Sequence, residues 1–125
     1  MSVPRTVIVR TQDHGRIMIP EPPWCTGEHP VEGYRVDITH QGPEVPLNLW
    51  SQRLQRDQEF LTAYLVQRPF SEFPATAVAF GGVDFFEYDS AGLRDVVDAL
   101  IVYALGHLPA LIRQLERIET DGDPA

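Results

Sequence analysis

The sequence predicts an α+β protein: a mainly antiparallel β-sheet of short strands, packed by one long C-terminal α-helix. Short β-branched or alternating segments, separated by glycine and proline, fill residues 5 to 88. Apolar side chains then recur at helical spacing as far as residue 119. The chain has 125 residues and a hydrophobic fraction of 43%, which suffices for a core. We therefore expect a single domain over residues 1–119 and a disordered acidic tail over 120–125.

The N-terminal segment is expected to form a hairpin followed by a stiff loop. Residues 5–11 and 16–19 are rich in β-branched and apolar side chains, and the Asp-His-Gly sequence at 13–15 is typical of a tight turn. Prolines then recur through residues 20–23. Because proline lacks a backbone donor and fixes its φ angle, we expect an extended loop that leads to Cys25.

Three further strands are predicted in the middle of the chain. Residues 34–40 alternate between apolar and polar side chains, so His40 is expected at the end of a core-facing row. Residues 45–49 also alternate, and Pro46 among them favours an edge strand. The third predicted strand covers residues 59–68.

Two glycines at positions 81 and 82 separate the apolar segments 75–80 and 83–88. The pair suits the positive φ angles of a two-residue hairpin turn. A phosphate-binding loop is the alternative, but the lysine-containing motif and a following helix are both missing from the sequence. The pattern therefore predicts a tight hairpin.

One kinked helix is predicted from Asp89 or Ser90 to about Glu119. Its apolar residues form a stripe that continues past Pro109. The stripe consists of Leu93, Val97, Leu100, Ala104, Leu108, Leu111, Leu115 and Ile118. Val102 and Leu105 point away from it, which predicts self-association or a protein partner on the outer side of the helix. The alternative is that these two residues pack beneath residues 51–74.

The charge of the chain excludes some classes of partner. A net charge of -8 and a pI near 4.8 argue against binding to nucleic acid or to an anionic membrane surface. The longest apolar run, residues 99–106, is shorter than the ~20 residues of a membrane span. No signal peptide pattern opens the sequence, so we expect a cytoplasmic protein without a membrane-spanning segment.

Chemistry-bearing residues concentrate around the single cysteine. Cys25 and His29 are four residues apart, so one loop can bring both to one ion, and His40 follows on the next predicted strand. Zinc prefers thiolate and imidazole ligands in a tetrahedral arrangement. The fourth ligand is expected to be His14, Asp37 or His107. With four protein ligands the zinc site is structural, whereas a water in the fourth position makes it hydrolytic.

Two other interpretations of these residues remain open. Cys25 can be a small buried hydrophobe, with His29 in solvent and His40 at a strand end. Alternatively, Cys25 is a nucleophile activated by a histidine, with Asp37 as the orienting carboxylate. The predicted strand argues against this second version, because Asp37 and His40 would lie on its opposite faces.

The chain resembles a family of small uncharacterised actinobacterial proteins that are often encoded on plasmids and in phages. The matching motifs are the Trp-Cys-x-x-x-His sequence at 24–29, the Asp-x-x-His sequence at 37–40 and the His-Gly pair at 14–15. The resemblance implies no established activity. If its motifs mark a metal site, it implies the ligands Cys25, His29 and His40, with His14 as the fourth.

The sequence therefore favours a small non-enzymatic interaction or regulatory protein, homodimeric through its helix, with a structural zinc site. A metal-dependent hydrolase is the first alternative. The second is an acidic nucleic-acid mimic of phage or plasmid origin, which would use the negative charge to occupy a basic groove.

Overall fold

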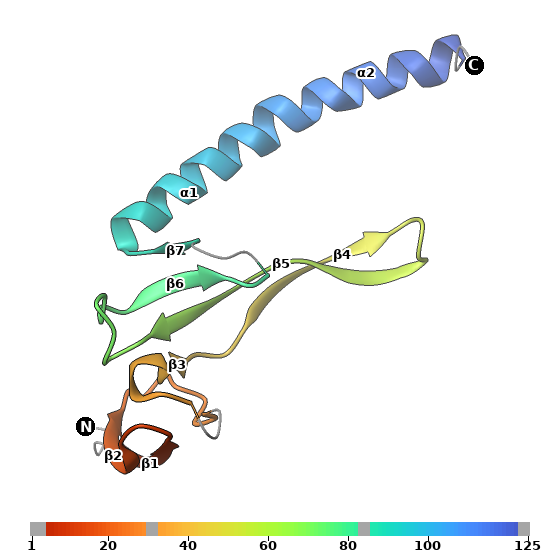
Figure 1. Ribbon diagram of the computed structural model, residues 1–125. Coiled ribbons are helices and arrows are strands. Elements are labelled where there is room, and N and C mark those ends of the chain that lie inside the picture. Colours follow the sequence, from red (N-terminus) through yellow and green to blue (C-terminus); the bar gives the residue numbers. More distant parts are fainter. Residues whose placement is uncertain (1–4, 30–32, 83–85, 123–125) are drawn as a thin grey trace. The chain divides into compact units, whose positions relative to one another are not determined.

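The structure is a computed structural model that describes residues 5–29, 33–82 and 86–122. Its described residues form antiparallel sheets of short strands and one long C-terminal helix, so the α+β prediction is confirmed (Figure 1). The chain divides into two compact units, Met1–Asp89 and Ser90–Ala125. The first unit contains the strands and the second contains the helix, and each is described by itself.

The first unit opens with the predicted hairpin. Strands β1 (Arg5–Thr11) and β2 (Gly15–Glu21) pair in antiparallel register, and Gly15 adopts a φ angle of 64° at the turn. Strand β2 is longer than predicted, because it continues through Pro20 to Glu21. Pro20 is tolerated because β2 pairs only with β1 among the described strands, which leaves its other edge without a ladder. The extension matters because it places Glu21 on the buried face of the hairpin.

The strand predicted over residues 34–40 is wrong. A short 3₁₀ turn, η1 (Arg35–Asp37), occupies its centre, and only His40 and Gln41 form a strand, β3. The backbone N–H of Arg35 donates to the Asp13 carboxylate at 2.9 Å, and the N–H of Asp37 donates to the Tyr34 carbonyl at 3.0 Å. These contacts curl the segment, since they give its backbone donors partners outside a sheet ladder.

The alternation of apolar and polar residues over 34–40 therefore does not mark a strand with one buried face. Tyr34 and Val36 are about half exposed, whereas Ile38 and His40 are buried. Only the second half of the predicted core-facing row enters the core.

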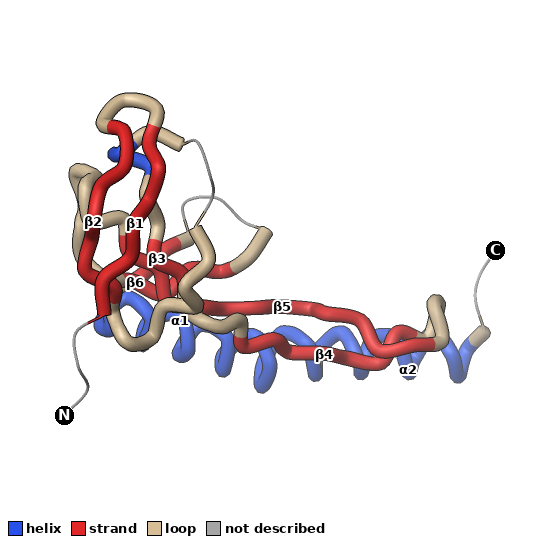
Figure 2. Tube along the Cα trace, turned by 90° about the horizontal axis from the view of Figure 1, so that it is seen from below, coloured by secondary structure: helices blue, strands red, loops and turns tan. Residues whose placement is uncertain are grey.

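A five-stranded sheet forms the rest of the first unit. Strands β3, β5 (Arg56–Gln67), β6 (Ala77–Phe80) and β7 (Glu87–Tyr88) follow one another across it, and β4 (Val45–Ser51) pairs with β5. All its pairings are antiparallel. β4 pairs with no other described strand, so the edge position predicted from Pro46 is confirmed. Figure 2 shows β4 and β5 as a long paired ribbon.

The connection between β6 and β7 is longer than the predicted two-residue turn. The N–H of Phe80 donates to the carbonyl of Phe86 at 3.1 Å, so more than two residues separate the paired ends. Residues 83–85, part of the second predicted strand, lie outside the described residues. Gly81 approaches β5 closely, and a Cβ at this position would lie 2.7 Å from the Thr62 methyl group. The hairpin is confirmed, and Gly82 has the positive φ angle expected of the pair, 80°, whereas Gly81 allows close packing on β5.

The core of the first unit is small. Val9 from β1, Ile19 from β2 and Ile38 after η1 form its buried cluster. Partly buried residues pack around this cluster, among them Val7, Ile17 and Phe70. The cluster lies beside the ends of β2 and β3, which carry the candidate site.

The second unit is a continuous helix over Ser90–Asp121, as predicted. It consists of α1 (Ser90–Val102), a π-helical turn η2 (Tyr103–His107) and α2 (Leu108–Asp121). In the π turn, the N–H of Leu108 donates to the carbonyl of Tyr103, five residues earlier. The wider turn immediately precedes Pro109, whose ring and missing donor disturb an α-helical ladder. The helix also continues to Asp121, two residues beyond its predicted end and inside the expected tail.

No residue of this helix is buried, so its predicted packing on the sheet stays a prediction. By length and composition alone, the helix could also cross a membrane. The exclusion of a membrane span stays a prediction as well.

Candidate metal centre

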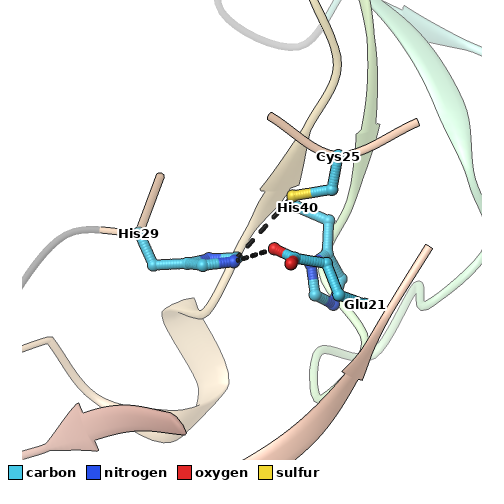
Figure 3. Close-up of side chains that lie close together, drawn as sticks. All are labelled: Glu21, Cys25, His29 and His40. Carbon is cyan, nitrogen blue, oxygen red and sulfur yellow. Dashed lines mark hydrogen bonds and ion pairs between the residues drawn. The ribbon is translucent and has the colours of Figure 1, made fainter. Parts of the chain in front are cut away.

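Four side chains meet where the hairpin adjoins the five-stranded sheet. Glu21 is the last residue of β2, Cys25 and His29 lie in the loop that follows, and His40 begins β3. One ligand atom from each lies within 4.8 Å of the other three. Figure 3 shows the four side chains converging from these separate segments. Glu21, Cys25 and His40 are buried, and the His29 side chain is only 6% exposed.

Backbone hydrogen bonds fix the position of Cys25. Its N–H donates to the Pro22 carbonyl at 3.0 Å, which closes a turn directly after β2. The N–H of Thr26 donates to the carbonyl of Gln41 at 2.9 Å and ties the loop to β3. The N–H of Gly27 points at the Cys25 sulfur at 3.4 Å, and Gly27 has a φ angle of 89°. The loop thus holds the sulfur between the two sheets.

His29 is oriented by a backbone carbonyl. Its Nδ1 lies 3.1 Å from the carbonyl oxygen of Thr39. A carbonyl only accepts, so Nδ1 carries a proton, and Nε2 also donates a proton to the Glu21 carboxylate when no ion is bound. A metal ion would replace the proton on Nε2. Nε2 lies 2.8 Å from Glu21 Oε1 and 3.9 Å from the sulfur of Cys25. A histidine that binds a metal usually donates its other ring N–H to a carbonyl or a carboxylate, which fixes the orientation of the ring.

His40 is the most deeply buried of the four residues, at 1% exposure. Its Nδ1 is buried without a hydrogen-bond partner, and its ring meets that of His29 edge to face at 5.2 Å. Figure 3 shows the His40 ring beside the Glu21 carboxylate. Burial lowers the pKa of His40, and the charge of His29 acts in the same direction while Glu21 opposes it. A neutral, unpartnered imidazole in this position is suited to bind a metal ion.

Arg5 supports the site from β1. Its Nε lies 3.0 Å from Glu21 Oε2, and its Nη2 donates to the Cys25 carbonyl at 3.1 Å. Burial acts to raise the pKa of Glu21, but hydrogen bonds from His29 and Cys25 and the charge of Arg5 outweigh it, so the pKa lies below its usual value. Glu21 is therefore a carboxylate, with Oε1 left to face the other three ligands.

The Cys25 thiol keeps its proton when no ion is bound. Burial raises the pKa of Cys25; the Gly27 N–H acts in the opposite direction, and the hydrogen bond and negative charge of Glu21 add to the effect of burial. A divalent ion reverses the balance, because the metal replaces the proton on sulfur.

The charges and distances of the group fit zinc. One carboxylate, one thiolate and two neutral imidazoles neutralise a divalent cation, and sulfur with imidazole selects zinc over calcium or magnesium. Tetrahedral zinc places its ligand atoms about 3.3–3.6 Å apart. Two of the separations here, 2.8 Å from His29 Nε2 to Glu21 Oε1 and 3.9 Å from His29 Nε2 to the Cys25 sulfur, lie on either side of that range. Small side-chain movements are enough to enclose an ion.

Three of the residues predicted from the sequence, Cys25, His29 and His40, lie together. The fourth, His14, is not in the group. It remains in the hairpin turn, where its Nδ1 lies 3.0 Å from Asp13 Oδ2 and its side chain is half exposed. Sequence reasoning missed Glu21, which takes the fourth position in the group.

The other two candidates for the fourth ligand are also outside this group. His107 lies in the second unit, where its ring packs against Tyr103 at 5.8 Å. Asp37 lies in η1 and lines a cavity of about 180 Å³ that touches His29 but none of the other three group members. The role of the predicted residues as metal ligands stays a prediction.

A protein family model matches residues 6–117 of the chain, so the chain belongs to that family, DUF6907, a domain of unknown function. The expectation of an uncharacterised family is confirmed to this extent. All four members of the group lie within the matched region. Neither a curated protein nor a solved structure matches the chain.

Proposed function

We propose that this member of the DUF6907 family is a small non-enzymatic protein whose first unit is held together by a structural zinc ion. The proposed ligands are Glu21, Cys25, His29 and His40. The observation that carries the proposal is the convergence of their four ligand atoms within 4.8 Å, largely shielded from solvent. The unpartnered Nδ1 of His40 supports it, since buried polar atoms normally have partners.

The size of the core supports a structural role for the ion. Among the described residues, the buried apolar cluster of the first unit contains Val9, Ile19 and Ile38, and Cys25, Val66 and Ala79 are also buried. Small units with little core often depend on a metal or on disulfides, and a single cysteine allows no disulfide within the chain. A structural zinc ion in a small peptide contributes about 10–16 kcal/mol of binding free energy to folding.

The hydrolase alternative requires an open position on the metal. Four protein ligands complete a tetrahedral site, whereas catalytic zinc usually keeps three and one water. The cavity at His29 does not reach Glu21, Cys25 or His40. We therefore favour the closed, structural site. A thiolate ligand also suits a reducing compartment, in line with our expectation of a cytoplasmic protein.

Metal analysis tests the proposal directly. Untagged protein is analysed for zinc by elemental mass spectrometry before and after mild chelation, and the chelated protein is then titrated with Co²⁺. We expect one zinc per chain, and for cobalt the intense visible bands of a tetrahedral site together with a sulfur charge-transfer band. Protein that holds no zinc and gives no cobalt bands overturns the proposal. Weak cobalt bands, typical of five or six ligands, would overturn the closed four-ligand site.

The exposed helix favours an interaction role for the second unit. Val102 and Leu105 are 61% and 77% exposed, and no residue of the helix is buried. Large exposed apolar surfaces generally mark contacts with another molecule. In this proposal, zinc stabilises the first unit and the helix binds the partner.

A further inference from the structure

One face of the C-terminal helix has a defined order of side chains. Asp98, Val102, Leu105, Pro109 and Arg113 follow one another at intervals of three or four residues, a spacing that places residues on one side of an α-helix. The π-helical turn at Tyr103–His107 rotates the second half of this row relative to the first. The row begins with an acid, ends with a base and is apolar between them. Between its two ends, residues 99–112 contain no Asp, Glu, Lys or Arg.

We infer that this outer row binds the same row of a second copy of the chain, with the two helices antiparallel. A two-fold axis between Leu105 and Gly106 brings residue n of one copy opposite residue 211 − n of the other. Asp98 then faces Arg113 of the second copy, and Arg113 faces Asp98 of the second copy. The apolar centres of the two rows cover each other.

The two Asp98–Arg113 pairs also set the direction of the helices, because parallel helices would bring Asp98 opposite its own copy. The next charged residues do not add to this attraction, since the same rule places Arg94 opposite Arg117 and Asp95 opposite Glu116 of the second copy.

The centre of the row also suits close approach. Gly106 has no side chain, and a Cβ built at this position would meet nothing within 4 Å. Leu105, 77% exposed, would lie opposite Gly106 of the second copy. A large side chain beside a glycine lets two helices pack closely.

A membrane fits this helix less well than a second copy. The uncharged residues 99–112 extend about 21 Å along a helix, against a hydrocarbon thickness of about 30 Å. A membrane also gives no reason for an acid at one end of the row and a base at the other. A protein surface with the opposite order of charges, such as the same row in antiparallel orientation, explains both charges.

Charge reversal tests both the dimer and its direction. Four full-length proteins are compared by sedimentation equilibrium in low salt: the wild type, Asp98→Arg, Arg113→Asp and the double variant. We expect a wild-type dimer, with a dissociation constant that rises at least about tenfold in each single variant, because each change makes two attractive pairs repulsive. The double variant restores both pairs, so its dissociation constant is expected to return to within about threefold of the wild-type value.

Three results would overturn the inference. A wild-type monomer at 100 μM excludes the dimer, and its co-sedimentation with phosphatidylglycerol vesicles would identify a membrane contact instead. A double variant as weak as the single variants excludes the antiparallel register. Single variants that dimerise like the wild type exclude this face. Circular dichroism establishes that each variant keeps its helix, and since the inference does not depend on zinc, zinc content tests the proposed function separately.

Discussion

The two units of this chain differ in how far their own residues complete them. In the first unit, side chains from β2, β3 and the intervening loop converge on one buried place, and hydrogen bonds fix two of them from outside. In the second, a helix of 32 residues buries none of its side chains. The first unit has a core but leaves one buried nitrogen without a partner, whereas the second has apolar side chains and no core.

This difference indicates what each unit requires. In our proposal an ion is enough for the first, because its ligand atoms are already gathered and a cation would neutralise them. The proposed partner of the helix would need a surface of comparable length, since the exposed apolar residues extend over several turns. Substitutions should therefore affect one unit without the other.

The largest effect is expected at the metal centre. Cys25→Ser removes the thiolate, so stoichiometric zinc should be lost and the melting temperature should fall by about 10 °C or more. Differential scanning calorimetry with and without added zinc measures the change. After chelation, the wild type and the variant should melt at similar temperatures. A zinc-loaded variant that melts like the wild type would show that zinc does not stabilise the fold.

The next effect should be confined to the helix. Leu105→Arg places a charge at the centre of the proposed interface and should raise the dimer dissociation constant about 100-fold or more, while zinc content stays the same. Gln114→Arg is the matched control, because it adds the same charge to an exposed helix position outside the row. Light scattering measures both masses. If both variants keep the wild-type mass, Leu105 does not contact a second copy.

A smaller effect distinguishes the two candidates for the fourth ligand. Glu21→Gln keeps the shape of the side chain but removes its charge, and should weaken zinc binding about 10- to 100-fold. His14→Ala should leave zinc affinity unchanged, because His14 pairs with Asp13 in the hairpin turn. Competition with a chromophoric chelator measures both. The opposite order of effects would identify His14 as the ligand.

The smallest effect is the pH dependence of the metal-free protein. The pKa of His40 is lowered from its usual 6.5, so the unfolded chain binds the proton more readily and stability should fall as the pH drops below about 6.5. The pKa of Glu21 is lowered from 4.5, which adds a further loss below about pH 4.5. The raised pKa of Cys25 acts in the alkaline range, where stability should fall above about pH 9.

Urea unfolding at a series of pH values measures this profile. Bound zinc should flatten it near neutrality, since coordinated side chains bind protons only when the metal leaves. Equal stability of the metal-free protein at pH 7 and pH 5 would contradict the burial of a neutral His40.

The sequence alone was enough to find three members of the group. Cys25 and His29 are brought together by one short loop, and His40 follows within reach, so local spacing was sufficient. Glu21 was missed because the prolines at 20, 22 and 23 indicate a loop. A signal was present: Ile17, Ile19 and Glu21 alternate onto the same face of β2, and all three are at least partly buried.

The errors in the fold have a common cause. The 3₁₀ turn at Arg35–Asp37 replaces a strand because the carboxylate of Asp13, more than twenty residues away, binds the N–H of Arg35. After β6, Gly81 packs on Thr62 of another strand, a contact that the local turn pattern does not reveal. Alternation and turn propensity are local properties, and contacts between distant residues override them. The long helix was predicted well because its signal is local along its whole length.

The grouping of the candidate ligands within residues 21–40 has a consequence for the order of events during synthesis. All four belong to one short stretch near the N-terminus, whereas the strand that pairs with His40 ends at Gln67, 27 residues later. At about 5–20 residues per second, translation needs roughly 1–5 s to reach that residue. During this interval an ion can bring the stretch together through a short loop closure. The metal would then act as a template on which β5 docks through its pairing with β3, before the helix has been synthesised.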